Sequence, residues 1–255
     1  MPITANSLFR DSVNFIRNQL SSFIMLALLA SFISYVLLQT MMPDTTVLHQ
    51  MITGSVGSSA MTRGEVEQAI KGMPYEQQLA IVEAAVPLFG AVALSFLLSQ
   101  TILIAGVINL VIQVSQGQPS SALRAIGSSV TSLPMLVVLL VISSIMITFG
   151  LSLYLLPGLF FAFVLVLSPI IMLESRKGLI YAISTSWGMA FSNLRIVLPI
   201  LLFTLSTKFI LLVISINLSA VSPMVVALLL SAVSNLVTAF LFVYLFRLYM
   251  QVKPA

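Results

Sequence analysis

Long runs of apolar residues, separated by short polar segments, extend along most of the chain. Six of these runs approach the length of a membrane-spanning helix, which needs about 20 apolar residues to cross a bilayer. We expect the spans at residues 20–40, 87–114, 134–156, 159–173, 197–218 and 224–246. The pattern therefore predicts an all-α fold, a polytopic membrane helix bundle with six transmembrane helices.

Two further features bear on the first, third and fourth runs. The first run is longer than the apolar core of a cleaved signal peptide, about 7 to 15 residues, so we expect it to be retained as a span. Pro157-Gly158, a dipeptide typical of turns, separates the third run from the fourth. The fourth run is the shortest of the six.

Residues 41–83 form the longest polar segment, and they carry most of the acidic side chains. We expect a loop in water here, with a short helical run starting near Pro74-Tyr75. A loop of this size does not indicate a second domain. We therefore treat residues 1–255 as a single integral membrane domain.

The segments before spans 1, 3 and 5 are amphipathic at helical spacing, with apolar and polar residues on opposite faces. Such patterns are typical of interfacial helices that lie on a leaflet. They indicate either a threefold repeat of one unit or ordinary amphipathic linkers. The apolar stripes are Phe9, Val13, Ile16 and Leu20; Leu123, Ile126, Val130 and Leu133; and Ile180, Ile183, Trp187, Phe191 and Leu194. We expect Trp187, Phe191 and Arg195 to act as interfacial anchors.

Basic residues near the span ends predict the orientation, because cytoplasmic loops are enriched in Lys and Arg. If both termini are cytoplasmic, eight basic residues lie on that side and two, Arg63 and Lys71, on the other. The eight are Arg10, Arg17, Arg124, Arg176, Lys177, Arg195, Arg247 and Lys253. We therefore expect cytoplasmic termini and an extracytoplasmic loop at 41–83.

Composition agrees with membrane residence. Hydrophobic residues make up 59% of the 255 residues and charged residues 7%, against about 25% charged in soluble domains. The net charge of +4 comes from scattered single residues rather than a basic cluster, which argues against nucleic acid as a partner. We expect membrane lipids as partners; the sequence indicates neither a protein partner nor an oligomeric state.

No set of residues with catalytic spacing is evident. The chain has one histidine, His49, and no cysteine, which excludes a multi-histidine metal site, disulfides and a cysteine nucleophile. Glu65 and Glu67, two positions apart on a possible helix, do not face one another. We expect no enzyme activity, no cofactor and no catalytic or metal-binding residues.

Lys208 is the one charged residue well inside a span. Intramembrane charges often mark functional sites, although a long side chain can also extend its ammonium toward the headgroups. Polar residues on neighbouring spans indicate either helix packing through hydrogen bonds or a polar cavity. A cavity lined by Lys208, Asn109 and Asn235 would be a candidate transport or lipid site.

Four segments together carry a family resemblance: residues 3–11, Pro74-Tyr75-Glu76-Gln77-Gln78, residues 121–127 and residues 244–250. They resemble the YciC family of uncharacterised enterobacterial inner-membrane proteins. The resemblance implies a six-span protein of the bacterial inner membrane. More distantly, residues 156–187 are similar to the membrane domain attached to some glycerophosphodiester phosphodiesterases, whose catalytic domain has no counterpart here.

We therefore expect a multi-pass inner-membrane protein that organises the envelope or its lipids without catalysis. The interfacial helices would contact the cytoplasmic leaflet. The alternative is a transporter or channel for an anion or a lipid, in which Lys208 would attract the negative charge.

Overall fold

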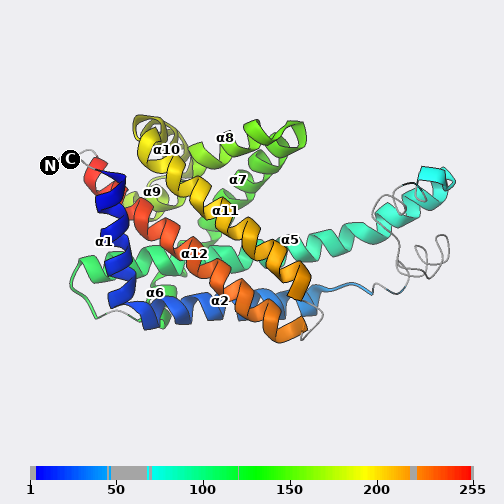
Figure 1. Cartoon of the computed structure of the whole chain (residues 1–255), viewed down its shortest axis with the longest axis horizontal. Coiled ribbons are helices and arrows are strands. Elements are labelled where there is room, and N and C mark those ends of the chain that lie inside the picture. The colour runs from blue at the N-terminus through cyan, green and yellow to red at the C-terminus, as the bar shows by residue number, and fades with distance from the viewer. Residues whose placement is uncertain are drawn as a thin grey trace. The chain divides into compact units, whose positions relative to one another are not determined.

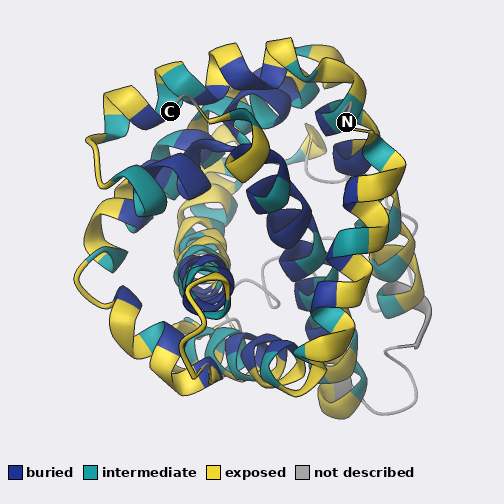
Figure 2. Cartoon of the chain, turned by 90° about the vertical axis from the view of Figure 1, so that its left-hand side faces the viewer, coloured by how far each residue is buried: buried dark blue, intermediate teal, exposed yellow. Residues whose placement is uncertain are grey.

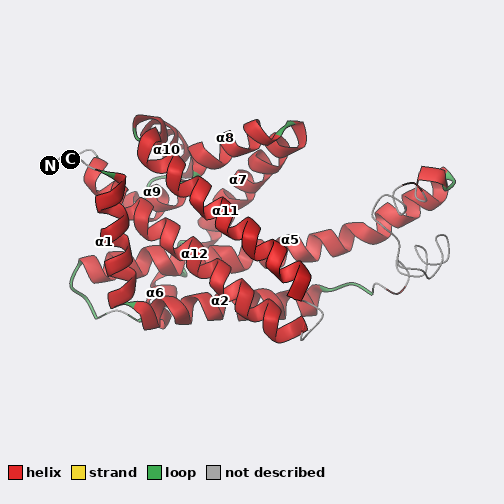
Figure 3. Ribbon diagram, in the orientation of Figure 1, coloured by secondary structure: helices red, strands yellow, loops and turns green. Residues whose placement is uncertain are grey.

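The chain is all-α in the parts that the computed structural model describes, which are residues 4–44, 46, 68, 71–119, 121–218 and 223–253. Figure 3 shows helices and loops without strands in these ranges. Six helical segments there are long and apolar enough to cross a membrane. The expected all-α polytopic architecture is confirmed. His49, Arg63, Glu65 and Glu67 lie outside the described residues.

The spans follow the apolar runs closely, and the starts of the first, third and fifth lie within three residues of the expected positions. Pro223 opens the last span, which continues past its expected end. The helices that form the spans are α2 (Leu20–Met41), α5 (Tyr75–Ser115), α7 (Leu133–Leu153), α8 (Leu155–Leu165) with α9 (Ser168–Ser175), α11 (Leu194–Leu218) and α12 (Pro223–Val252).

The second span begins earlier than the sequence pattern predicts. Helix α5 starts at Tyr75, so the short helical run expected there continues directly into the span. The apolar run predicts a start near Pro87. Pro87 instead lies inside α5, and the end of the expected polar loop is helical.

The fourth span consists of two helices with a break between them. Pro169 has no amide hydrogen, so it cannot donate the helical hydrogen bond to the carbonyl of Leu165. The hydroxyl of Ser168 donates to that carbonyl instead, at 2.5 Å. Together α8 and α9 cover Leu155–Ser175, which is 21 residues and long enough to span.

The turn between α7 and α8 lies at Tyr154, whose backbone is extended (φ −162°, ψ 165°). The prediction of a turn at Pro157-Gly158 was wrong, because both residues lie in the first turn of α8, where proline is tolerated. Gly158 serves close packing. A Cβ added at Gly150 would lie 2.8 Å from the backbone of Gly158, so α7 and α8 touch through glycine.

Three short helices precede spans 1, 3 and 5, as expected. They are α1 (Ala5–Asn18), α6 (Ala122–Ser129) and α10 (Leu179–Ser192). The Thr4 hydroxyl accepts a hydrogen bond from the backbone amide of Ser7 at the start of α1. The Ser121 hydroxyl accepts one from the backbone amide of Arg124 at the start of α6. These caps fix where the two helices begin.

The described structure divides into two compact units. Unit 1 comprises Met1–Ile33 and Leu97–Ala255, and unit 2 comprises Ser34–Phe96, with α2 and α5 contributing to both. The apolar core of unit 1 includes Phe23, Leu103, Ile108, Leu136, Ile170 and Tyr244. All features described below lie in unit 1. The treatment of residues 1–255 as one domain stays a prediction.

Two of the three expected units share a burial pattern. In both α1 and α10 a 14-residue helix is followed by one residue of similar conformation, Gln19 (φ −119°, ψ 25°) and Asn193 (φ −120°, ψ 30°), and then by a span. Seven buried residues of α1–α2 each correspond, at one constant separation in sequence, to a buried residue of α10–α11. The pairs are Leu8 and Ala182, Ser12 and Ser186, Phe15 and Met189, Phe23 and Val197, Leu26 and Ile200, Ala27 and Leu201, and Ala30 and Thr204.

Candidate functional site: an exposed apolar helix layer and a basic pocket

The two chain termini and the polar ends of several helices meet at one end of unit 1, which we call the terminal end. There Glu174, near the end of α9, lies 2.7 Å from the Nζ of Lys253 and accepts a hydrogen bond of 2.8 Å from Tyr249. Arg247 pairs with Asp11 at 3.2 Å. These contacts join α12 to α9 and to α1, and Figure 1 shows both termini here.

The three short helices bury narrow faces against the rest of unit 1. Each buried face contains a serine that is fully buried: Ser12, Ser129 and Ser186. The hydroxyls of Ser12 and Ser129 donate to carbonyls within their own helices, and that of Ser186 donates to the carbonyl of Val164 in α8 at 2.6 Å. Small side chains with satisfied hydroxyls allow close helix packing.

The apolar stripes recognised in the sequence lie mainly on the outer side of these helices, away from the core. In Figure 2, buried and exposed residues alternate along the helices at the terminal end. Ile180 is 82% exposed, and Ile16, Ile126, Leu133 and Ile183 are half-buried. The other stripe residues are exposed: Phe9, Val13, Leu20, Leu123, Val130, Trp187, Phe191 and Leu194. In water such a surface would be unfavourable, whereas in a bilayer it contacts lipid.

The proposed anchors of α10 are held by aromatic contacts. Trp187 lies edge-on to Phe160 of α8, with ring centroids 5.3 Å apart, and Phe191 lies edge-on to Phe163 at 5.6 Å. Both anchors remain partly exposed. Arg195 follows in the first turn of α11 and is exposed. Each aromatic anchor therefore touches the protein with one side and the surroundings with the other.

The three candidate residues of the transport or lipid site occupy different surroundings. Among the described residues, no hydrogen bond or ion pair joins any two of Lys208, Asn109 and Asn235. Lys208 is half-buried in α11 and has no such partner in the described part of the chain. The geometry thus divides the expected set into separate features.

Asn235 belongs to a buried hydrogen-bond network between spans. Its side-chain amide donates to the hydroxyl of Ser31 in α2 at 2.9 Å, and its carbonyl oxygen accepts from Gln100 of α5 at 2.9 Å. The Ser99 hydroxyl donates to the carbonyl of Ala30 nearby, at 2.9 Å. Since these hydrogen bonds cross from one helix to another, the network stabilises the packing of α2, α5 and α12. Sequence reasoning did not identify Gln100 or Ser31.

Asn109 lies beside a cavity of about 270 Å³ at the terminal end. Its side-chain amide donates to the Ser129 hydroxyl at 2.6 Å. Residues from α5, α6, α7, α9 and the segments between them line the cavity: Asn109, Ser128, Thr131, Ser132, Met135, Met172, Leu173, Arg176 and Lys177. We call this cavity the basic pocket.

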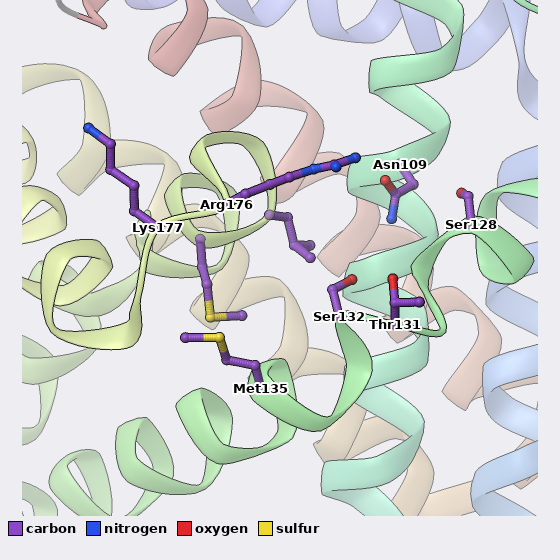
Figure 4. Close-up of a pocket in the computed structure, with 9 residues that line it drawn as sticks. Asn109, Ser128, Thr131, Ser132, Met135, Arg176 and Lys177 are labelled. Carbon is purple, nitrogen blue, oxygen red and sulfur yellow. The ribbon is translucent and has the colours of Figure 1, made fainter.

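Arginine and lysine supply the charge of the basic pocket, and no carboxylate lines it. Figure 4 shows the Arg176 side chain extending toward Asn109, whereas the Lys177 side chain points away. The Lys177 ammonium lies 4.3 Å from the centre of the Tyr181 ring. Sequence reasoning found Asn109 but treated Arg176 only as a topology signal. Nothing else in the sequence around Arg176, at the end of a span, indicated that its side chain lines a pocket.

In the described ranges, no three of His, Cys, Asp and Glu gather closely enough to hold a metal ion. The arrangement instead offers two kinds of surface to a membrane. One is the apolar outer layer of α1, α6 and α10, and the other is the basic pocket.

The fold and these surfaces define a multi-pass helical membrane protein. Residues 1–251 match the model of a family described as "Uncharacterised protein family (UPF0259)". A "UPF0259 membrane protein" of Serratia proteamaculans (strain 568) is 41% identical over 254 residues, covering 99% of this chain and 100% of the relative. Its counterpart in Yersinia pestis (strain Pestoides F) is 38% identical over 256 residues, covering 100% and 98%.

The chain therefore belongs to the UPF0259 family of membrane proteins. This confirms the resemblance, drawn from the sequence, to an uncharacterised family of multi-pass membrane proteins over the whole chain. No solved structure matches the chain.

Proposed function

We propose that this protein organises lipids of the bacterial inner membrane without catalysis, through helices embedded in the cytoplasmic leaflet. One observation carries the proposal: each of the three short helices leaves large apolar side chains exposed on the side away from the core, among them Val13, Leu123 and Ile180. A helix on the surface of a soluble protein carries polar and charged residues on that side instead. In this arrangement both termini and the basic residues of the terminal end face the cytoplasm.

Transfer of the outer stripes from water to lipid stabilises the helices in the leaflet. Transfer of a large apolar side chain from water yields about 1.5–3 kcal/mol, so a half-exposed one gains roughly 1 kcal/mol. Several such residues per helix outweigh the cost of lying in the interface. The helices thereby displace headgroups over the area that they cover, which changes local lipid packing.

An apolar cavity beside α10 supports the same proposal. It has a volume of about 470 Å³ and is lined by Leu156, Pro157, Leu159, Phe160, Phe163, Phe191, Leu194 and Leu198. A lipid acyl chain matches this lining, because every contact would be apolar. Phe191 belongs both to the cavity and to the outer stripe, so the leaflet is continuous with the cavity.

The proposal is tested in a strain that lacks the protein, complemented with variants and examined for membrane order and lipid composition. Leu123→Ser with Val130→Ser places two hydroxyls on the outer stripe of α6, where neither side chain is buried. We expect this variant to fail to restore the wild-type values. The control is Ser184→Ala with Ser192→Ala, which changes two exposed serines of α10 bonded only within that helix. Equal restoration by both variants would contradict the proposal.

A second candidate function is transport of an anion or lipid through Lys208. It is favoured by one observation, the half-buried ammonium of α11 with no hydrogen-bond or ion-pair partner in the described part of the chain. Such a group attracts a negative charge at membrane depth. The variant that separates this candidate from the first is given in the Discussion.

A further inference from the structure

We infer that the basic pocket binds a phosphate-bearing anion, with the Arg176 guanidinium as its principal ligand. The inference concerns a site distinct from the outer stripes. A lipid headgroup and free phosphate offer the same chemistry to the pocket. Binding of a headgroup rests on the proposed function, whereas binding of free phosphate does not.

Arg176 is exposed, and no carboxylate among the described residues neutralises its charge. In the described ranges Arg176 makes no ion pair and no side-chain hydrogen bond. The nearest carboxylate in sequence, Glu174, is bonded to Lys253 at 2.7 Å and to Tyr249 at 2.8 Å. An arginine beside a cavity that contains no carboxylate is suited to a planar, bidentate contact with phosphate oxygens.

The backbone at Arg176 supports a role beyond ending the helix. Arg176 follows α9 in the left-handed conformation (φ 54°, ψ 21°), and it is the non-glycine residue with positive φ in the described chain. Glycine is the usual residue at this position, since it adopts the conformation without strain. For an arginine this left-handed backbone conformation is unfavourable. Its side chain extends across the pocket toward Asn109 (Figure 4).

Neutral groups on the opposite wall complement the guanidinium. The Thr131 hydroxyl has no hydrogen-bond partner among the described residues. Ser132 precedes α7 and makes no side-chain bond to the first-turn amides of that 21-residue helix. The Leu133 amide donates to the carbonyl of Val130 and Pro134 has no amide hydrogen, so the start of α7 adds only the field of its dipole beside the pocket.

The size and the remaining walls limit the ligand. A volume of about 270 Å³ is slightly below the usual range of small-molecule pockets, about 300–1,000 Å³, and suits one phosphate with a small substituent. Met135, Met172 and Leu173 make the third side apolar. A phosphate attached to a glycerol fits polar and apolar walls together, and inorganic phosphate fits the polar walls alone.

The test uses the full chain in a nonionic detergent that contains no phosphate. Calorimetric titration with inorganic phosphate measures one source, and native mass spectrometry with added phosphatidylglycerol measures the other. Arg176→Gly removes the guanidinium and relaxes the backbone, so the variant should fold. Arg176→Lys keeps the charge but loses the bidentate geometry. Arg124→Gln is the matched control, because Arg124 lies on α6 outside the pocket lining and bonds the Pro119 carbonyl.

We expect Arg176→Gly to weaken binding by about tenfold or more, the equivalent of one lost charge-assisted contact. Arg176→Lys should bind with intermediate affinity, and Arg124→Gln should equal the wild type. Binding of inorganic phosphate identifies an anion site, and retention of phosphatidylglycerol alone identifies a headgroup site. If the wild type binds neither inorganic phosphate nor phosphatidylglycerol, the inference is overturned. An equal loss of binding affinity in Arg176→Gly and Arg124→Gln would also overturn it. Neither result bears on the position of the outer stripes, which is measured separately.

Discussion

The side-chain amide of Asn235 lies 2.9 Å from the hydroxyl of Ser31, and this bond ties α12 to α2 in the buried centre of unit 1. Asn235 is 3% exposed, and its other bonds reach Gln100 and the carbonyl of Ala27. A leucine at position 235 would fill similar space but would leave Gln100 and Ser31 without these partners. We expect Asn235→Leu to lower the free energy of unfolding by about 1–2 kcal/mol.

Thermal unfolding in detergent measures this effect. Asn14→Leu is the control, because Asn14 is exposed on α1 and has no hydrogen-bond partner among the described residues. A midpoint for Asn235→Leu equal to that of the control would show that the network does not stabilise the span packing.

Two alanine substitutions are expected to change the stability in opposite directions, one at the contact between α7 and α8 and one on the open side of α10. Gly150→Ala places a Cβ 2.8 Å from backbone atoms of Gly158, which cannot move without separating the helices. We expect a loss of about 1–3 kcal/mol in unfolding free energy. Gly188→Ala in α10 meets nothing within 4 Å, so it should stabilise the protein by about 0.5–1 kcal/mol. Denaturant titration of both variants measures whether the free energy of unfolding falls in Gly150→Ala and rises in Gly188→Ala.

Lys208→Met distinguishes the two candidate functions. Methionine keeps the length of the side chain and removes its charge. If the protein organises lipids, this variant should restore membrane order and lipid composition in the deletion strain as fully as the wild type. Loss of restoration, with unchanged thermal stability, would favour transport through Lys208.

The sequence predicts the spans well because the bilayer imposes one length and one polarity on them. A charge-free run placed α2, an apolar run interrupted only by Lys208 placed α11, and the periodic apolar stripe placed α10 before its span. Helix ends were less predictable where proline had two possible roles. Pro87 lies inside a helix that begins at Tyr75, and Pro169 divides the fourth span.

The basic pocket could be predicted only in part. Asn109 was recognised because a polar residue inside a span is unusual. Arg176 was not recognised, because a basic residue at the end of a span already serves the orientation of the chain. Its approach to Asn109 depends on the break in the fourth span and on the turn at Val130–Ser132, neither of which the apolar pattern contains.

The depth of Trp187 in the bilayer tests the central claim most directly. Trp187 is the only tryptophan of the chain, so its fluorescence reports one site. The purified protein is placed in vesicles that contain lipids with a quencher at different depths along the acyl chain. We expect the strongest quenching from the quencher just below the headgroups. Strong quenching by a water-soluble quencher, with little from any lipid quencher, would contradict an embedded position for α10.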